Sequence, residues 1–425
     1  MKFNYKKNRE VIITRLCQAK SLDDLVVILN NIQELYLVDN PHFIHMNKPV
    51  TSQLLKYIVY GKEKRYHQFQ VAKKSGGIRT ITAPSDAIKN TQRLLNIALQ
   101  CLYTPTQSTT GFVIGKSIVD NANRHVNKKY VYNIDLQDFF SSIQFTRIRG
   151  LLGNVELPNK WLKSRVLSFA SEQSIVLDKL VLNPDVAHYI ANLCCFEGVL
   201  PQGAPTSPTV SNMVCKVLDY KLYKLSEKYG LTFTRYADDI TFSTNKPAIT
   251  SELKAEIFAI IRKEGFELNE AKERIQVYGK ELDGKLNRER QMVTGIVVNK
   301  KANVSKRYIR NLKAAIYNWE KHGYAIASNK HESFYVNEKG FLRYNGNVPK
   351  MELVIGGKLE FLGMVRGKKD TTYRLLKLRF DQLCKKEHVD TAFLNEILDL
   401  WDEKGLKRAI DRMYNRQKNV VIEEE

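Results

Sequence analysis

The sequence has few cysteines, and they follow no recognisable pattern. None of the six forms a CxxC pair, and their spacing is irregular. Such spacing argues against a zinc ribbon and against a disulfide framework, so we interpret the cysteines as reduced and mostly buried thiols. The six are Cys17, Cys101, Cys194, Cys195, Cys215 and Cys384.

Long apolar segments are also missing. The sequence contains no run of about eighteen apolar residues, which is the length needed to span a bilayer. The first residues, 1–7, lack the apolar core of a signal peptide. Hydrophobic residues make up 43% of the chain and charged residues 26%, which is typical of a globular protein. We therefore expect a cytoplasmic protein without a membrane partner.

Acidic residues are scarce relative to basic ones. The chain has 45 Asp and Glu against 67 Lys and Arg, a formal charge of +22. Lys and Arg side chains placed on phosphates release condensed counterions, so nucleic acid is the expected partner. A merely basic soluble protein is one alternative. An anionic membrane surface is another, although no basic amphipathic helix stands out.

Hydrophobic periodicity predicts helices and strands in a mixed order. The absence of regular β-α-β alternation favours an α+β fold over a doubly wound one. Helices are expected over most of 11–60, 145–198, 209–229 and 305–321. Strands are expected over 65–84 as a hairpin, over 130–136 and, as a pair, over 231–244.

Carboxylates occur where strands are predicted. Asp238 and Asp239 lie inside a half-buried hairpin, where adjacent like charges are unfavourable unless a cation compensates. A solvated Asp-Asp turn is the alternative for this pair. Asp135 ends the apolar strand 130–134, although Asp is depleted in strands. On neighbouring strands, three carboxylates could hold two Mg²⁺ ions about 3.5–4 Å apart.

The segment 200–208, Leu-Pro-Gln-Gly-Ala-Pro-Thr-Ser-Pro, stiffens a turn before a helix. By itself it is typical of an ordinary rigid loop. The order of Asp135 with Phe140, then 201–208, then Tyr-Ala-Asp-Asp at 236–239 resembles motifs A, B and C of reverse transcriptases. Residues 76–84 look like the fingers motif of that family, and residues 265–272 look like its motif D.

The resemblance covers roughly residues 60 to 385 and implies a right-hand polymerase fold with an antiparallel palm sheet. The expected parts are an N-terminal helical region at 1–60, fingers at 61–130, a palm at 131–300 with a finger-like helical insertion at about 145–200, a thumb at 301–388 and a C-terminal extension at 389–425. Residues 323–355 and those after about 388 have no further interpretation.

The resemblance also implies catalytic roles. Asp135 and Asp238 would be direct ligands of Mg²⁺, with the Leu136 carbonyl nearby. Asp239 would be a less direct carboxylate of the same site. Lys272 would assist the pyrophosphate leaving group.

Further positions would form the nucleotide pocket. Arg79 and Lys73 would grip the triphosphate of a dNTP, because an arginine fork suits phosphate oxygens. The backbone amides of Asp138 and Phe139 would face the same phosphates, and Gln202 would line the pocket.

Phe140 would lie under the sugar and exclude a 2′-hydroxyl, so the expected product is DNA. A polymerase that makes RNA is a lesser rival. Phe139 is interpreted as a core aromatic.

Two segments resemble signatures of bacterial retron reverse transcriptases. They are Asn-Ala-x-x-His, with Asn121 and His125, and the run Val293, Thr294 and Gly295. We expect an RNA-binding role for these segments, with a structural role open for His125. RNA contacts are also expected from a basic helix of the thumb that carries Lys306, Arg307, Arg310 and Lys313.

The retron resemblance implies specific partners. Retron enzymes copy part of their own structured non-coding RNA, of msr-msd type. They start from a 2′-hydroxyl of a guanosine and leave a branched RNA–DNA product, msDNA. They act in anti-phage defence with an effector protein. Two alternatives stay open: a polymerase-like fold kept as an RNA-binding scaffold, and another bacterial reverse transcriptase of group II type.

Overall fold

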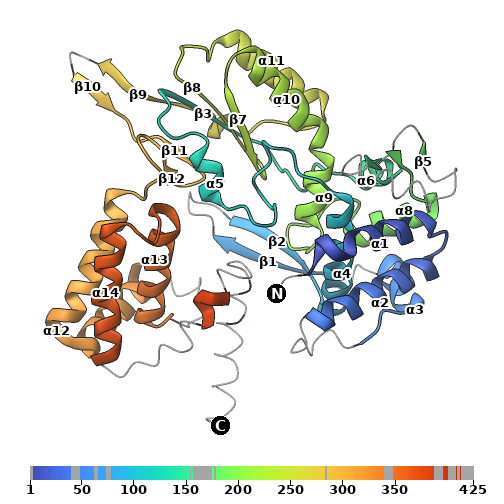
Figure 1. The fold of residues 1–425 in the computed structure, drawn as a ribbon, viewed down its shortest axis with the longest axis horizontal. Coiled ribbons are helices and arrows are strands. Elements are labelled where there is room, and N and C mark those ends of the chain that lie inside the picture. The colour runs from blue at the N-terminus through green and yellow to red at the C-terminus, as the bar shows by residue number, and fades with distance from the viewer. Residues whose placement is uncertain are drawn as a thin grey trace. The chain divides into compact units, whose positions relative to one another are not determined.

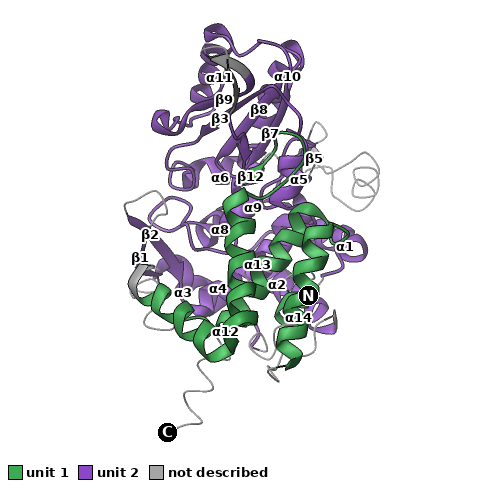
Figure 2. Ribbon diagram, turned by 90° about the vertical axis from the view of Figure 1, so that its left-hand side faces the viewer, with its two compact units in different colours: residues 1–2, 295–425 green, residues 3–294 purple. Residues whose placement is uncertain are grey.

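A computed structural model describes most of the chain. The described residues are 3–39, 48–61, 66–72, 78–153, 155–156, 175–176, 179–282, 285–338, 348–386, 396–400, 408 and 412. The chain divides into two units, one spanning Phe3–Thr294 and one that begins at Gly295 (Figure 2).

The largest sheet described in the first unit has five antiparallel strands and is seen in the upper part of Figure 1. The strand order is β10-β9-β3-β8-β7. The strands are β3 (Tyr130–Asp135), β7 (Thr232–Tyr236), β8 (Asp239–Thr244), β9 (Arg274–Leu282) and β10 (Lys285–Arg288). The predicted strand at 130–136 and the predicted pair at 231–244 are therefore neighbours in one sheet.

The sheet has two chemically different faces, because side chains alternate along each strand. On the adjacent strands β3, β8 and β7, Phe242 is directly opposite both Tyr132 and Phe233, and the three rings form an apolar, buried face. Their opposite face is polar, with the Asn133 amide donating to the Thr241 hydroxyl at 2.9 Å. The register thereby decides which strand residues can meet at the end of the sheet.

Helices pack on part of this sheet and on one another. α10 packs against β7 and α11, and α4 packs against α1 and α2. The helices of the first unit are α1 (Tyr5–Gln18), α2 (Leu22–Asp39), α3 (Ser52–Tyr60), α4 (Asp86–Leu102), α5 (Ile118–Asn123), α6 (Phe145–Leu152), α8 (Pro184–Cys194), α9 (Ser207–Val214), α10 (Lys216–Lys228) and α11 (Ser251–Lys263).

Two small sheets complete the first unit. The predicted hairpin at 65–84 is present as β1 (Tyr66–Ala72) and β2 (Ile78–Pro84). The helix prediction for 145–198 is met by α6 and α8 at its two ends and is wrong for three short described segments between them, while residues 157–174 lie outside the described residues. There the short strands β4 (Val155–Glu156), β5 (Ile175–Val176) and β6 (Lys179–Leu180) pair with one another. β-Branched side chains in β4 and β5 favour strands.

The helix predicted over 209–229 is divided. It consists of α9 and α10, which are separated at Cys215. Near the end of the unit a short turn, η4 (Glu270–Lys272), precedes β9, and β11 (Met292–Val293) follows β10.

The second unit is helical. After β12 (Ile296–Val297) come α12 (Lys306–Glu338), α13 (Met351–Arg366) and α14 (Thr371–Lys386), which pack on one another around Trp319 and Phe380. α12 bends at Gly323, which has φ 77°. Among the described helices of the chain, none has the length and apolarity needed to cross a bilayer. Helices combined with antiparallel sheets confirm the α+β class.

Candidate active site

Three carboxylates from distant parts of the sequence meet at one end of the central sheet. Asp135 is the last residue of β3 and is directly opposite Asp239, the first residue of β8. Directly opposite residues point to the same face of a sheet. Asp238 occupies the turn between β7 and β8, and its carbonyl accepts a hydrogen bond from the Leu136 amide at 3.0 Å.

This convergence changes the acidity of the carboxylates. Burial, followed by repulsion from Asp238 and Asp135, raises the pKa of Asp239 from 3.8 to about 7. Burial and repulsion from Asp135 also raise the pKa of Asp238. The fold therefore keeps mutually repelling carboxylates close together, as expected of a site that binds cations.

The metal-free protein should lose stability as pH rises through this range. The pKa of Asp239 is about 7 in the folded protein and 3.8 as a reference for the unfolded chain. As pH rises, Asp239 loses its proton in the unfolded chain before it does so in the folded protein. The free energy of unfolding should therefore fall between about pH 4 and pH 7. Urea unfolding in EDTA at several pH values measures this slope.

Asp239→Asn should flatten that slope, because an amide does not titrate. The exposed Asp185 of α8 provides a matched control, and Asp185→Asn should leave the slope as in the wild type. Equal slopes for Asp239→Asn and the wild type would contradict the assignment.

Two basic side chains act on the same carboxylates. The Lys272 ammonium lies 2.7 Å from the Asp135 carboxylate, although about half of the Lys272 side chain is exposed. The positive charges of Lys272 and of Arg79, on β2, offset part of the rise in the Asp238 pKa that burial causes. The end of β2 also contacts the Pro-Gln-Gly loop, since the Gly203 amide donates to the Thr82 carbonyl at 3.0 Å.

Gly203 is required for this approach. A Cβ at this position would lie 2.6 Å from the Thr82 carbonyl oxygen. Gln202 is exposed on the same loop. The prediction for Lys73 lies outside the described residues.

The turn after β3 exposes backbone amides. Within the described part of the chain, neither Asp138 nor Phe139 donates its amide hydrogen to another group. Asp138 is exposed and has φ 45°, whereas Phe139 is 4% exposed and packs on Phe266. Phe140 is half-buried and lies beside Phe139, with ring centroids 5.4 Å apart.

Phe112 is an aromatic neighbour that the motif analysis missed. Its ring lies 6.2 Å from Phe140 and 6.4 Å from Tyr236, and the side chain is 40% exposed. Phe112, Asp138 and Ala237 all have positive φ. For residues other than glycine this costs on the order of 1–3 kcal/mol each and is concentrated at functional sites.

The retron-like segments contact each other inside the first unit. The Asn121 amide donates to the Thr294 hydroxyl at 3.5 Å and its oxygen accepts from Thr110 at 2.7 Å. Asn121, His125 and Val293 are at most 1% exposed, so their side chains are not available to RNA in this structure. The expectation of direct RNA contact is corrected for these three residues. Gly295 begins the other unit and is exposed.

His125 has the structural role that the sequence left open. Its ring nitrogens lie 2.7 Å from the Ser243 and Thr234 hydroxyls, which belong to β8 and β7. Burial lowers the pKa of His125 to about 3, so the ring is neutral and links the two strands. By contrast, Lys306, Arg307, Arg310 and Lys313 are exposed on α12.

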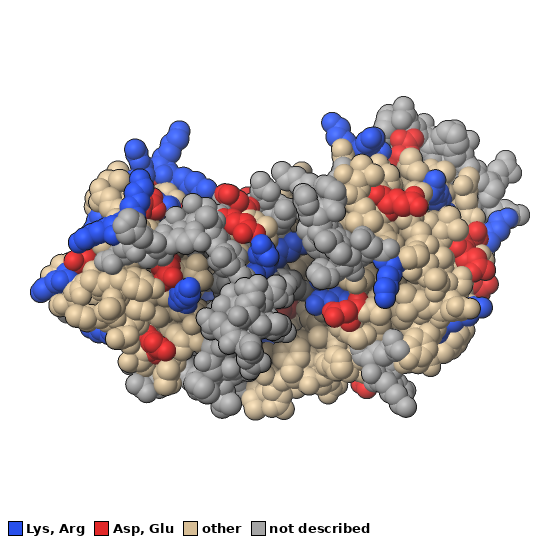
Figure 3. All heavy atoms as spheres, turned by 90° about the horizontal axis from the view of Figure 1, so that it is seen from below, with Lys and Arg blue, Asp and Glu red and all other residues tan. Residues whose placement is uncertain are grey.

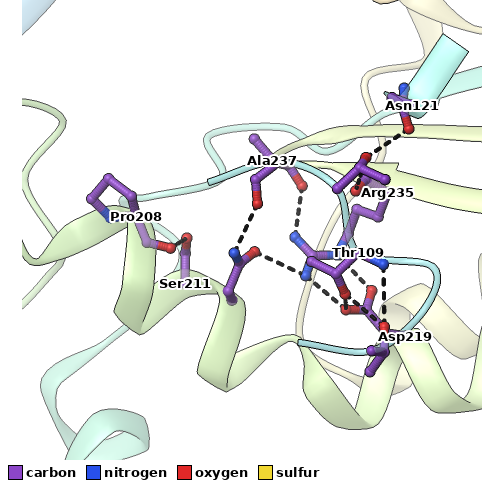
Figure 4. A network of polar contacts seen from close by, with 11 residues as sticks. Thr109, Asn121, Pro208, Ser211, Asp219, Arg235 and Ala237 are labelled. Carbon is purple, nitrogen blue, oxygen red and sulfur yellow. Dashed lines mark hydrogen bonds and ion pairs between the residues drawn. The ribbon is translucent and has the colours of Figure 1, made fainter. Parts of the chain in front are cut away.

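A polar network behind the site was also missed. Arg235 of β7 and Asp219 of α10 form a fully buried ion pair next to Ala237 (Figure 4). One signal was available in the sequence: Arg235 is the only charged residue of β7, and a charge in a buried strand requires a partner.

The donor set fits Mg²⁺ in part. Among the described residues, no group of three His, Cys, Asp or Glu side chains is arranged to hold a metal ion by itself. Mg²⁺ commonly takes one or two carboxylates and completes its shell with waters and substrate phosphates. Burial and repulsion from Asp135 raise the pKa of Asp238, so these two carboxylates suit that incomplete shell.

Comparisons with known proteins support the motif analysis. The family model described as reverse transcriptase (RNA-dependent DNA polymerase) matches residues 71–342. The retron Mx65 reverse transcriptase of Myxococcus xanthus is 33% identical over 256 residues, which are 60% of this chain and 56% of the relative. The retron Mx162 reverse transcriptase of the same organism is 33% identical over 277 residues, 60% of this chain and 53% of the relative.

A third relative is the retron Ec86 reverse transcriptase of Escherichia coli. It is 28% identical over 288 residues, which are 67% of this chain and 79% of the relative. The chain thus spans little more than half the length of the two Myxococcus relatives. The matches confirm the retron-type resemblance drawn from the motifs.

Proposed function

Because this chain belongs to the reverse transcriptase family, we propose that it is an RNA-directed DNA polymerase of the retron type. It copies part of a cognate structured non-coding RNA, starts from a 2′-hydroxyl and leaves a branched RNA–DNA product. It works within an anti-phage defence system together with an effector protein.

The observation that carries the proposal is the meeting of Asp135, Asp238 and Asp239 beside Arg79 and Lys272. Two bound Mg²⁺ ions would activate the attacking hydroxyl and stabilise the pyrophosphate that leaves. Asp135 and Asp238 would be the direct ligands of the ions, and Asp239 would be a less direct carboxylate of the same site. An RNA-binding scaffold has no need for this combination of charges.

The surrounding groups bind and orient the dNTP. Arg79 binds the triphosphate with its guanidinium fork, and the amides of Asp138 and Phe139 donate to the same oxygens. Lys272 balances the charge of the leaving pyrophosphate. Gln202 lines the pocket from the loop that contacts β2.

Exposed basic residues bind the RNA. Lys and Arg side chains extend from the face drawn in Figure 3, with Asp and Glu side chains among them. On α12, Lys306, Arg307, Arg310 and Lys313 contact phosphates, whereas 2′-hydroxyls distinguish RNA from DNA.

A primer-extension assay with an RNA template, Mg²⁺ and dNTPs tests the function. The expected result is a DNA product templated by RNA. Tight RNA binding without extension would favour the scaffold instead. Sequencing the nucleic acid that copurifies with the protein identifies the cognate RNA, and a branched product separates retron priming from a group II-type reaction.

Arg79→Ala should raise the KM for dNTP. A hydrogen bond to a charged group is worth about 1.5–3 kcal/mol, which corresponds to roughly 10- to 150-fold. Arg79→Lys keeps the charge but loses the fork, so its effect should be smaller. Steady-state kinetics measure both variants, and an unchanged KM in Arg79→Ala would place the triphosphate elsewhere.

A further inference from the structure

A buried ion pair joins the hairpin that carries Asp238 to the helix behind it. Both Arg235, on β7, and Asp219, on α10, are fully buried. The Arg235 Nε donates to the Asp219 Oδ1 at 2.6 Å, and Nη2 donates to Oδ2 at 2.7 Å (Figure 4). A guanidinium offers this two-point geometry to a carboxylate, and a lysine ammonium does not.

The other donors of Arg235 reach the turn beside the carboxylates. Nη1 donates to the Ala237 carbonyl at 3.0 Å, and Nη2 donates to the Asn212 Oδ1 at 3.2 Å. Ala237 directly precedes Asp238 and has φ 58°. Arg235 therefore holds the peptide plane from which the Asp238 side chain extends.

The loop before α5 closes the network from the other side. The Thr109 hydroxyl donates to the Asp219 Oδ2 at 2.7 Å, and the Asn212 amide donates to the Gly111 carbonyl at 2.9 Å. A Cβ added at Gly111 would lie only 2.4 Å from the Ala237 nitrogen. The turn is thus held between this loop and Arg235.

Stability alone does not account for the pair. Replacing a buried ion pair by apolar side chains of similar volume is often neutral or stabilising. An apolar side chain cannot donate to the Ala237 carbonyl, so the turn would lose the contact that orients it. The arginine is therefore suited to holding geometry next to the site.

Resting on the proposed polymerase function, we infer that Arg235 is a positioning residue for catalysis. Anchored by Asp219 and Asn212, it sets the direction of the Asp238 carboxylate through the Ala237 carbonyl. A misplacement of about 1 Å near a reacting centre costs on the order of 100-fold in rate. Because Arg235 is fully buried, it cannot contact RNA or dNTP, so its loss acts through the Asp238 carboxylate on kcat and metal affinity.

The test uses Arg235→Lys, the double variant Arg235→Met/Asp219→Leu and the control Lys221→Met. The control removes the ion pair that Lys221, on another part of α10, forms with Glu264. Both Arg235 variants should lose about 100-fold in kcat for RNA-templated extension. At saturating Mg²⁺, the KM for dNTP and the Kd for primed RNA should stay within about threefold of the wild type. The control should match the wild type in all three.

Mn²⁺ binding, followed by electron paramagnetic resonance without turnover, is the second readout. Loss of a residue that orients a metal ligand weakens metal binding about 10- to 100-fold, and both Arg235 variants should show this. Wild-type kcat and Mn²⁺ affinity in the folded double variant would overturn the inference.

Whether the variants fold also bears on the inference about Arg235. If Arg235→Lys does not fold, the double variant decides, because it removes both charges. Failure of both beside a folded control would make the pair purely structural and overturn the inference. An inactive wild type counts against the polymerase function itself, whereas an active wild type with unaffected Arg235 variants counts only against the role of Arg235.

Discussion

Asp238→Asn should reduce nucleotide incorporation about a thousandfold without unfolding the protein. Charge stabilisation by a bound metal ion is worth several kcal/mol in a transition state, and each 1.4 kcal/mol or so corresponds to a factor of ten. An amide keeps the shape of the side chain but has no charge with which to hold Mg²⁺. Single-turnover extension of a primed RNA template measures the loss.

The same substitution should leave metal-free stability unchanged or raise it. Burial and repulsion from Asp135 raise the pKa of Asp238, so its charge is unfavourable in the folded protein without metal. Asp135→Asn should behave differently, because Asp135 forms an ion pair with Lys272 that the amide would weaken. Thermal unfolding in EDTA compares the two variants.

The exposed Asp86 of α4 provides the control. Asp86→Asn should keep both activity and stability. Incorporation by Asp238→Asn within about tenfold of the wild type would mean that this carboxylate does not hold the metal.

Phe140→Ala should admit ribonucleotides. Phe140 is half-buried, and its ring packs beside Phe112 and Phe139 at the edge of the site. Forcing an extra atom into a packed pocket costs typically about 1–3 kcal/mol. This corresponds to roughly 5- to 150-fold discrimination that the alanine should remove. The ratio of kcat/KM for dNTP and for the matching ribonucleotide measures it.

Phe139 is the matched control, because it is the adjacent aromatic but lies in the core at 4% exposed. Phe139→Leu should lower the free energy of unfolding and leave the sugar preference as it is. An unchanged ratio in Phe140→Ala would assign sugar selection to another side chain, with Phe112 as the nearest aromatic.

The parts of the fold that depend on residues close together in the sequence were predictable. The hairpin at 65–84, the buried strand ending at Asp135 and the strand pair around Asp238 all follow from alternation and turn residues. The short strands β4, β5 and β6 were not, because strands of two residues are too short to show any periodicity.

The network behind the site could not be derived from local patterns. Asp219 and Arg235 are 16 residues apart on a helix and a strand, and Thr109 joins them from 110 residues away. His125 similarly joins hydroxyls of β7 and β8. Contacts between residues so far apart in the sequence depend on how helices and strands pack. Such packing produces no regular spacing of residues that could be recognised in the sequence.

By itself, the sequence indicated the kind of chemistry, because carboxylates at predicted strand ends favour cations and a large basic surplus favours polyanions as partners. Only the tertiary structure decided which carboxylates meet and what holds them. The antiparallel register places Asp135 opposite Asp239, and burial gives Asp239 a pKa of about 7. Register and burial both arise from contacts between distant segments, which is why they appear only once the chain is folded.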